Sequence, residues 1–224
     1  MPRLRRLFAL LSALSVSVST LTSTLTLSTL TLSPALAAGA PLCQPEPKES
    51  PAKEALWNRY LGQLASLGRN LPARPDAKLL MPVQGVRVRD VADTWGAPRG
   101  GGFVHAGQDI FARRGTPVYS ATNGVVWRVS QSPRGGIWVY VLGAGGRRYY
   151  YAHLSSVARG LREGQRVTTR TLIGAVGSTG EAETTPPHLH FGVFTKYQPG
   201  VGCRFGAIDP LPLLVDREAG GDQR

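Results

Sequence analysis

The chain has 224 residues, a hydrophobic fraction of 42% and a formal net charge of +12 at pH 7. This length suits one domain with a substantial core, preceded by an N-terminal extension. The strong positive charge favours acidic polymers as partners. The same charge is compatible with nucleic acid, but we expect no nucleic-acid partner, because the sequence has an export signal and no recognisable nucleic-acid-binding motif.

Residues 1–37 predict a signal peptide. Met1 to Arg6 forms a basic start, a Ser/Thr/Leu/Val-rich run follows it, and Ala35-Leu36-Ala37 matches a small-x-small cleavage signal. The run is rich in hydroxyl side chains, so no stable membrane span is expected; an uncleaved anchor is the alternative. We therefore expect the mature protein in the periplasm, in the cell wall or outside the cell.

Residues 38–78 are expected to hold a linker and one amphipathic helix. Proline, lysine and glutamate dominate residues 41–54, which is typical of a solvated linker. The next apolar side chains recur at helical spacing over about four turns, at Leu56, Tyr60, Leu64 and Leu67. Such a stripe usually packs on its own domain. The alternatives are a helix that blocks a groove and a helix that binds a partner.

The two cysteines, Cys43 and Cys203, lie far apart in the sequence. An even number of cysteines in an exported chain favours a disulfide over two free thiols. In the chain-entropy model, a bond closing so long a loop stabilises the fold by up to about 5 kcal/mol. It would also fasten the N-terminal extension to the C-terminal end of the domain.

From Leu79 onward the sequence consists of short β-prone runs separated by glycine, which predicts a mainly β domain over residues 79–214. Gly143 to Gly146 predicts the turn of a hairpin. The polar residues 215–224 are expected to form a flexible tail. The expected strands are Pro117 to Ala121, Val125 to Val129, Ile137 to Leu142 and Arg147 to Ala152, with Val167 to Thr171 and Leu172 to Val176 as weaker candidates.

The segment from Pro187 to Phe194 places polar and apolar side chains on opposite faces of one strand. Since side chains alternate along a strand, the apolar set of Leu189, Phe191 and Val193 is expected to face the core. His188 and His190 then share the other face with Cα atoms roughly 6–7 Å apart, close enough for both rings to address one metal ion or its bound water.

The chain has four histidines, and the other two are His105 and His153. His105 precedes Asp109 by four residues, and an imidazole with a carboxylate is a ligand pair well suited to zinc. The surrounding glycines argue against a helix, and a straight strand would separate the two Cα atoms by about 13 Å. We therefore expect the backbone to bend at Gly107.

Together with His190, His105 and Asp109 would give three protein ligands, which leaves a position for water as in catalytic zinc sites. The sequence has no His-Glu-x-x-His motif, so the helix-borne glutamate base of many zinc proteases is absent. A neutral imidazole titrates near the working pH. His153 and His188 are therefore the candidates to accept the proton of the bound water.

Three consecutive tyrosines, Tyr149 to Tyr151, precede His153 in one expected strand. If the strand continues to His153, Tyr149 and Tyr151 share its face, and we expect them to line a substrate groove. Tyr150 would then lie on the opposite face, as an ordinary core or surface residue.

Three motifs of this chain, taken in order, resemble those of the lysostaphin-type (LytM-domain) zinc metallopeptidases. The flanking Thr94-Trp95-Gly96 and Asp209-Pro210 agree with this resemblance, which covers about residues 80–214. The family consists of bacterial endopeptidases that mostly cut the peptide cross-links of peptidoglycan. The motifs are His105-x-Gly107-x-Asp109, Tyr151-Ala152-His153-Leu154-Ser155 and His188-Leu189-His190-Phe191.

The resemblance implies a LytM-like, duplicated-hybrid-motif fold of antiparallel β-sheet, with a narrow groove whose floor carries the metal. It implies one zinc ion per chain bound by His105, Asp109 and His190. It places His153 and His188 beside the catalytic water and the developing oxyanion. The implied function is that of an exported zinc endopeptidase, with peptidoglycan as the substrate.

Two positions depart from the family pattern. Gln108 occupies a place that is usually apolar, and Thr184 to Pro187 stands where a Ser/Thr-Thr-Gly-Pro run is more usual. Neither departure removes a ligand, but both bear on the groove wall.

Two other functions are compatible with such a domain. Some LytM-like domains that have lost ligands are non-catalytic and bind the cell wall or activate a wall amidase, whereas a general secreted protease differs only in its substrate. The presence of all the ligands favours the enzyme. Nothing in the sequence indicates an oligomeric state.

Overall fold

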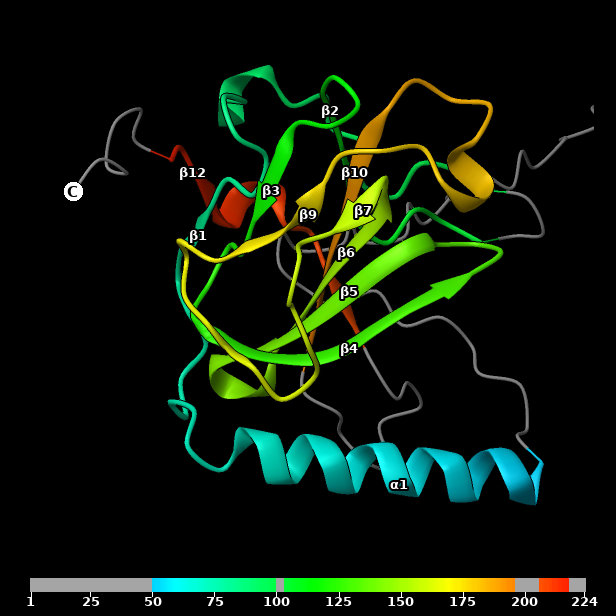
Figure 1. Cartoon of the computed structure of the whole chain (residues 1–224), viewed down its shortest axis with the longest axis vertical. Helices are drawn as coiled ribbons and strands as arrows, with labels where there is room; N and C mark the ends of the chain where they lie inside the picture. Colours follow the sequence, from blue (N-terminus) through cyan, green and yellow to red (C-terminus); the bar gives the residue numbers. More distant parts are fainter. Residues whose placement is uncertain (1–49, 100–102, 196–205, 218–224) are drawn as a thin grey trace, which may run out of the picture. The chain divides into compact units, whose positions relative to one another are not determined.

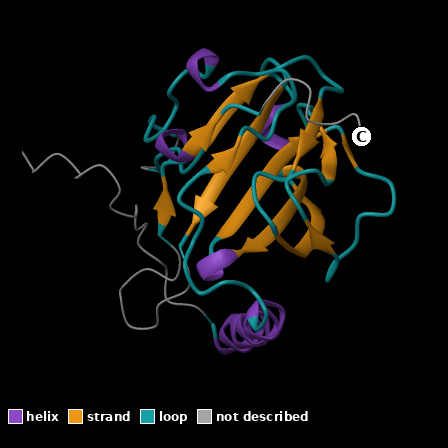
Figure 2. Cartoon of the chain, turned by 90° about the vertical axis from the view of Figure 1, so that its left-hand side faces the viewer, coloured by secondary structure: helices purple, strands orange, loops and turns teal. Residues whose placement is uncertain are grey.

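The computed structural model describes residues 50–99, 103–195 and 206–217, in which strands are the dominant elements (Figure 2). The predicted signal peptide and both cysteines, Cys43 and Cys203, lie outside the described residues, so the signal peptide and the disulfide stay predictions. The elements are α1 (Pro51–Gly68), β1 (Leu79–Leu80), β2 (Gln108–Phe111), β3 (Pro117–Tyr119), β4 (Gly124–Ser132), β5 (Gly136–Gly143), β6 (Arg148–Leu154), β7 (Ser156–Val157), β8 (Arg166–Val167), β9 (Leu172–Ala175), β10 (His188–Phe194), β11 (Ala207–Ile208) and β12 (Leu214–Val215).

The largest sheet is antiparallel and follows the strand order β11-β10-β6-β5-β4-β8, with β2 also paired to β10. Figure 1 labels β2, β10, β6, β5 and β4 of this sheet. A smaller antiparallel sheet has the order β3-β9-β7, and β1 pairs in parallel with β12. The expected mainly β, antiparallel fold is confirmed. The weaker strand candidate over Val167 to Thr171 is wrong, because pairing ends at Val167 and a turn follows.

One face of the large sheet forms the core. Leu189, Phe191 and Val193 of β10 are fully buried in the main hydrophobic cluster, as their alternation predicts. At about 25 cal/mol for each Å² of apolar surface removed from water, burial of one such side chain stabilises the fold by roughly 1.5–3 kcal/mol. The core therefore fixes which face of β10 is left for His188 and His190.

Helix α1 confirms the expected helix, but it begins at Pro51, inside the segment expected to be a linker. Proline is favoured at the first helical position, where a missing N–H costs no hydrogen bond. Tyr60 packs edge-on against Trp127 of β4 with ring centroids 6.2 Å apart, and the Arg128 guanidinium lies 4.6 Å from the centre of the Tyr60 ring. The helix thus packs on its own domain.

The C-terminal tail begins later than expected. Val215 belongs to β12, and Arg217 donates hydrogen bonds to the carbonyl oxygens of Met81, Ser120 and Thr169. The predicted boundary at residue 215 is therefore wrong for residues 215–217, which the sheet and these bonds hold. Among the described residues, no helix combines the length and the apolar character that crossing a bilayer requires.

Candidate metal centre

Strand β10 lies between β6 and β2, and the register of these pairs assembles the site. His190 stands directly opposite Asp109 of β2 on one side and opposite Ala152 of β6 on the other. Side chains of directly opposite residues in an antiparallel pair lie on the same face of the sheet. The register therefore brings His190 to Asp109, although 81 residues separate them in the sequence.

His105 reaches the same point because the chain bends at Gly107, immediately before β2. The expected bend is confirmed. Gly107 also packs tightly: a Cβ atom there would lie 2.7 Å from Cε1 of His190 and 2.8 Å from the backbone oxygen of Phe191. Since atoms of this kind cannot approach so closely, only glycine lets the His190 ring occupy its place.

Replacing Gly107 by alanine is expected to displace the His190 ring and to weaken metal binding by about 10–100-fold, the usual effect of disturbing a ligand's support. The measurement is the zinc dissociation constant in competition with a chromophoric chelator. Gly160→Ala is the matched control, because a Cβ atom there meets nothing within 4 Å although its φ of +78° adds backbone strain. An unchanged zinc affinity in Gly107→Ala would contradict the steric role.

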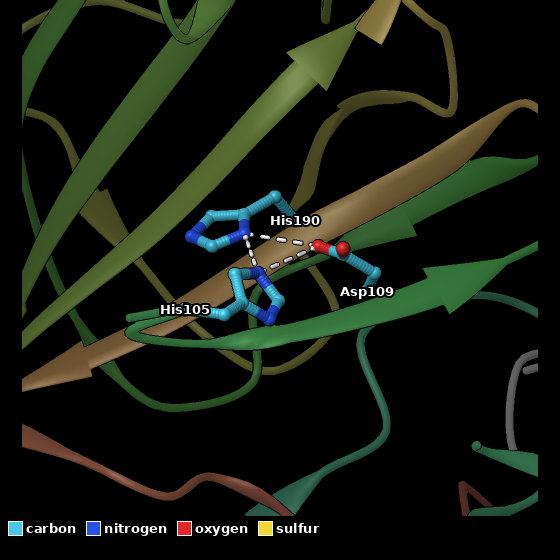
Figure 3. Close-up of side chains that lie close together, drawn as sticks. All are labelled: His105, Asp109 and His190. Carbon is cyan, nitrogen blue, oxygen red and sulfur yellow. Dashed lines mark hydrogen bonds and ion pairs between the residues drawn. The ribbon is translucent and has the colours of Figure 1, made fainter. Parts of the chain in front are cut away.

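Three ligand atoms converge on one point, as Figure 3 shows for His105, Asp109 and His190. Nε2 of His105 lies 2.8 Å from Nδ1 of His190, and Oδ1 of Asp109 lies 3.0 Å from each of these nitrogens. Zinc–nitrogen bonds of about 2.0–2.1 Å in tetrahedral geometry place neighbouring ligand atoms about 3.3 Å apart. The three atoms therefore fit a zinc ion after small adjustments.

The hydrogen bond at Nδ1 of His105 determines which of its two ring nitrogens can bind a metal. Nδ1 of His105 lies 2.7 Å from the carbonyl oxygen of Thr94. A carbonyl oxygen only accepts hydrogen bonds, so Nδ1 carries the proton and Nε2 keeps its lone pair. That lone pair faces His190 and Asp109.

The carboxylate of Asp109 is strongly held in its ionised form. Burial by itself raises its pKa, but hydrogen bonds and positive charge from His105 and His190, when their facing nitrogens are protonated in the absence of metal, bring it well below its ordinary value. Its second oxygen, Oδ2, accepts a hydrogen bond from Nη2 of Arg99 at 3.0 Å. Oδ1 is thereby left as the oxygen that faces the two imidazoles.

The remaining two histidines border the same point. The ring of His188 lies 5.0 Å from that of His153 between centroids, and Nε2 of His188 lies 3.8 Å from Oδ1 of Asp109. Nδ1 of His188 donates to the carbonyl oxygen of Pro186 at 2.9 Å, and Nδ1 of His153 donates to that of Thr179 at 2.8 Å. Both neutral rings therefore keep an unprotonated Nε2.

His153 has an unusual backbone conformation that turns its side chain towards the site. Its φ is +60°, in the left-handed region that residues other than glycine rarely adopt. Tyr150 and Ala152 line the cavity beside His190, so simple alternation would have aimed His153 at the opposite face. The left-handed turn at His153 restores it to the cavity side.

The prediction that Tyr149 and Tyr151 line the groove is wrong. Both are fully buried in the core, and Tyr151 accepts a hydrogen bond on its hydroxyl from the backbone N–H of Ala121 at 2.9 Å. Burial raises the pKa of Tyr151 to about 12. Tyr150, expected to be an ordinary core or surface residue, is the tyrosine that lines the cavity.

The metal-free protein is expected to lose stability as the pH falls from about 6.5 towards 4. Burial lowers the pKa of His153 to about 4, against an ordinary value of 6.5 that applies to the unfolded chain. Between these values the unfolded chain binds more protons, so the free energy of unfolding decreases as the pH falls. Chemical denaturation in the presence of a chelator measures this dependence.

The control for this pH effect is His153→Asn, because asparagine tolerates a positive φ better than most residues and does not titrate in this range. Its stability should fall less over the same pH interval. Equal pH dependence in the two proteins would contradict the assignment of the effect to His153.

The five residues border a cavity of about 880 Å³. Its wall includes residues that no sequence pattern placed in the site: Arg99, Arg134, Tyr140, Tyr150 and Glu181. Arg99 lies shortly after the Thr94-Trp95-Gly96 motif. Its ion pair with Asp109 could not be predicted, because no local sequence pattern indicates a contact across the intervening glycines. No residue of α1 lines the cavity, so the described residues give no support to a groove-blocking helix.

Two imidazoles and a carboxylate that converge beside a cavity, with two further histidines in its wall, are a donor set suited to a catalytic metal site. Residues 103–200 match the model described as peptidase family M23, so the chain contains an M23 peptidase domain.

Individual relatives agree with this family. The chain is 40% identical over 128 residues to the L-Ala--D-Glu endopeptidase of Bacillus subtilis, covering 54% of this chain and 38% of that protein. It is 34% identical over 95 residues to the peptidoglycan DD-endopeptidase ShyA of Vibrio cholerae, covering 42% of this chain and 21% of that protein. The chain thus spans well under half the length of these relatives.

A solved structure is similar as well. The catalytic domain of lysostaphin from Staphylococcus simulans is 30% identical, with 56% of this chain and 92% of that chain covered and a TM-score of 0.47.

Proposed function

We propose that this protein is an exported, zinc-dependent endopeptidase that hydrolyses peptide bonds in peptidoglycan cross-links. The observation that carries the proposal is the convergence of His105 Nε2, Asp109 Oδ1 and His190 Nδ1 within 3.0 Å of one another, in a cavity that His153 and His188 also line. Three nitrogen and oxygen ligands with further histidines beside them are the donor set of a catalytic zinc site.

The substrate class and the location rest on separate support. ShyA is named a peptidoglycan DD-endopeptidase, and the match to the family model includes the motifs of all four histidines. Removal of residues 1–37 would take away Arg3, Arg5 and Arg6 and change the net charge from +12 to 12 − 3 = +9, which would steer the mature protein to acidic wall polymers. The basic start and the small-x-small signal at Ala35 to Ala37 support export and a mature chain that begins at Ala38.

His105, Asp109 and His190 would hold the metal. A bound zinc ion supplies a Lewis acid that polarises a carbonyl and lowers the pKa of water to about 7. The residues around it have separate tasks. The carbonyl of Thr94 fixes the orientation of His105, and Arg99 holds the outer oxygen of Asp109.

His153 and His188 would move the proton. Each ring has its Nδ1 proton fixed by a carbonyl oxygen, so each presents an Nε2 lone pair that can accept a proton from water. Once protonated, the same nitrogen can donate a hydrogen bond to an oxyanion or pass the proton to the leaving amine. Burial keeps His153 neutral above a pKa of about 4, so it is available as an acceptor at neutral pH.

The experiment that tests this function measures zinc content and hydrolysis on the same purified mature protein. Stoichiometric zinc, together with release of peptidoglycan fragments that a chelator abolishes and zinc restores, is the expected result. Mass spectrometry of the fragments identifies the bond that is cut, and casein tests for general proteolysis. A protein that retains full activity after removal of zinc would contradict the proposal, and zinc without hydrolysis would favour a non-catalytic wall-binding domain.

A further inference from the structure

The side chain of Gln108 forms a buried polar cluster behind the metal centre. Gln108 directly precedes Asp109 in β2, so the two side chains point to opposite faces of the strand. Gln108 is fully buried and does not line the cavity. Its side chain therefore cannot contact a substrate, and a role in the site has to act through other residues.

All four hydrogen-bonding positions of the Gln108 amide are used. Oε1 accepts from the backbone N–H of Thr94 at 2.9 Å and from its hydroxyl at 3.1 Å. Nε2 donates to Oδ1 of Asp93 at 2.7 Å and to Oδ1 of Asp209 at 3.0 Å. A primary amide has two acceptor positions and two donor hydrogens, so the surroundings match this functional group completely.

Thr94 connects this cluster to two of the proposed ligands. Its carbonyl oxygen accepts the Nδ1 proton of His105 at 2.7 Å, and its hydroxyl oxygen accepts the backbone N–H of Asp109 at 2.9 Å. Gln108 holds the same residue at its backbone nitrogen and its hydroxyl. Any movement of Thr94 would therefore turn the His105 ring and shift the backbone of Asp109.

We propose that Gln108 and Thr94 are positioning residues that hold His105 and Asp109 in the metal-binding geometry. The proposal rests on the proposed function only in taking these two residues as metal ligands. Gln108 also ties the site to Asp209, 101 residues away, and so to the C-terminal part of the domain.

No other side chain meets these requirements. Methionine fills a similar volume but leaves the backbone N–H of Thr94 and the oxygens of Asp93 and Asp209 short of partners. Glutamate keeps the acceptor oxygens but cannot donate when ionised, and it would place a third carboxylate beside Asp93 and Asp209. Methionine is therefore expected to release Thr94, whereas glutamate is expected to destabilise the cluster through repulsion from Asp93 and Asp209.

The test is the zinc dissociation constant of Gln108→Met and Thr94→Val, measured by chelator competition well below the melting temperature of each protein. Both variants are expected to bind zinc about 10–100-fold more weakly than the parent, the range found when support of a ligand is removed. Thr94→Ser keeps the hydroxyl and should restore an affinity close to that of the parent.

Ser120→Ala is the matched control for a purely structural effect. Ser120 is also fully buried, and its hydroxyl donates to the carbonyl oxygen of Thr122 at 2.7 Å, away from the cavity. This variant should lose stability without losing zinc affinity. A second readout is activity: Gln108→Met should lose turnover at limiting zinc and regain most of it at saturating zinc, with KM unchanged.

Zinc affinities of Gln108→Met and Thr94→Val within about twofold of the parent, which is under 0.5 kcal/mol, would overturn the proposal. If Thr94→Val weakens binding and a folded Gln108→Met does not, Gln108 has no positioning role. Should Gln108→Met fail to fold, Thr94→Val and its serine rescue still decide whether this cluster positions the ligands. A parent that binds no zinc would overturn the proposed function. A parent that binds zinc, with variants of unchanged affinity, would overturn only the positioning role.

Discussion

Replacing Asp109 by asparagine is expected to remove bound zinc and peptidoglycan hydrolysis together. The substitution keeps the size of the side chain but removes the negative charge that His105 and His190 face at 3.0 Å. Metal polarisation contributes several kcal/mol to the reaction, so hydrolysis should fall by about three powers of ten or more. Zinc content by elemental mass spectrometry and fragment release from isolated cell walls measure both effects.

His105→Ala should have the same double effect, because it removes the nitrogen that lies 2.8 Å from Nδ1 of His190. Asp90→Asn is the matched control for the change of charge, since Asp90 is exposed and pairs only weakly with Arg89 at 3.7 Å. This control should keep zinc and activity. Retention of stoichiometric zinc and full hydrolysis by Asp109→Asn would refute the assignment of the ligands.

His153→Asn and His188→Gln are expected to keep zinc and to lose turnover. Neither residue belongs to the group of three ligand atoms, but both line the same cavity, and their Nδ1 hydrogen bonds leave Nε2 free to accept a proton. Positioned proton transfer contributes typically about 10²–10⁴-fold, and kcat should fall by this factor in each variant. Asparagine is chosen at His153 because it tolerates the φ of +60°.

The comparison of zinc content with kcat distinguishes a proton-transfer role from a ligand role. Loss of zinc in His153→Asn or His188→Gln would show that the residue binds the metal. An unchanged kcat with full zinc would remove that residue from the reaction. The pH dependence of kcat in each single variant then shows which imidazole titrates as the base.

The residues that meet at the candidate metal centre could be predicted because few alternatives existed. With four histidines in the chain, the pair at 188 and 190 and the spacing from His105 to Asp109 left little freedom. Apolar alternation gave the faces of β10, and the bend at Gly107 followed from the distance that a straight strand would impose. These inferences depended on local geometry, which a sequence expresses directly.

The tyrosine faces could not be predicted in the same way. The inference assumed that alternation continues through His153, but its φ of +60° reverses the side on which this one residue projects. Histidine has no strong intrinsic preference for that conformation, so nothing local announces the reversal. Packing of Tyr149 and Tyr151 in the core decides which faces these two tyrosines occupy.

The sequence by itself determined the residue types of the site, the β character of the domain and the face of β10 that carries His188 and His190. The tertiary structure alone decided what surrounds them: the opposition of His190 and Asp109, the pairing of Arg99 with Asp109, and the cluster of Gln108 with Thr94 and Asp209. Local patterns report alternation and bending, because these depend on neighbouring residues. The contact of His190 with Asp109 spans 81 positions of the sequence, and that of Gln108 with Asp209 spans 101. Such contacts depend on strand register and burial, which only the folded chain establishes.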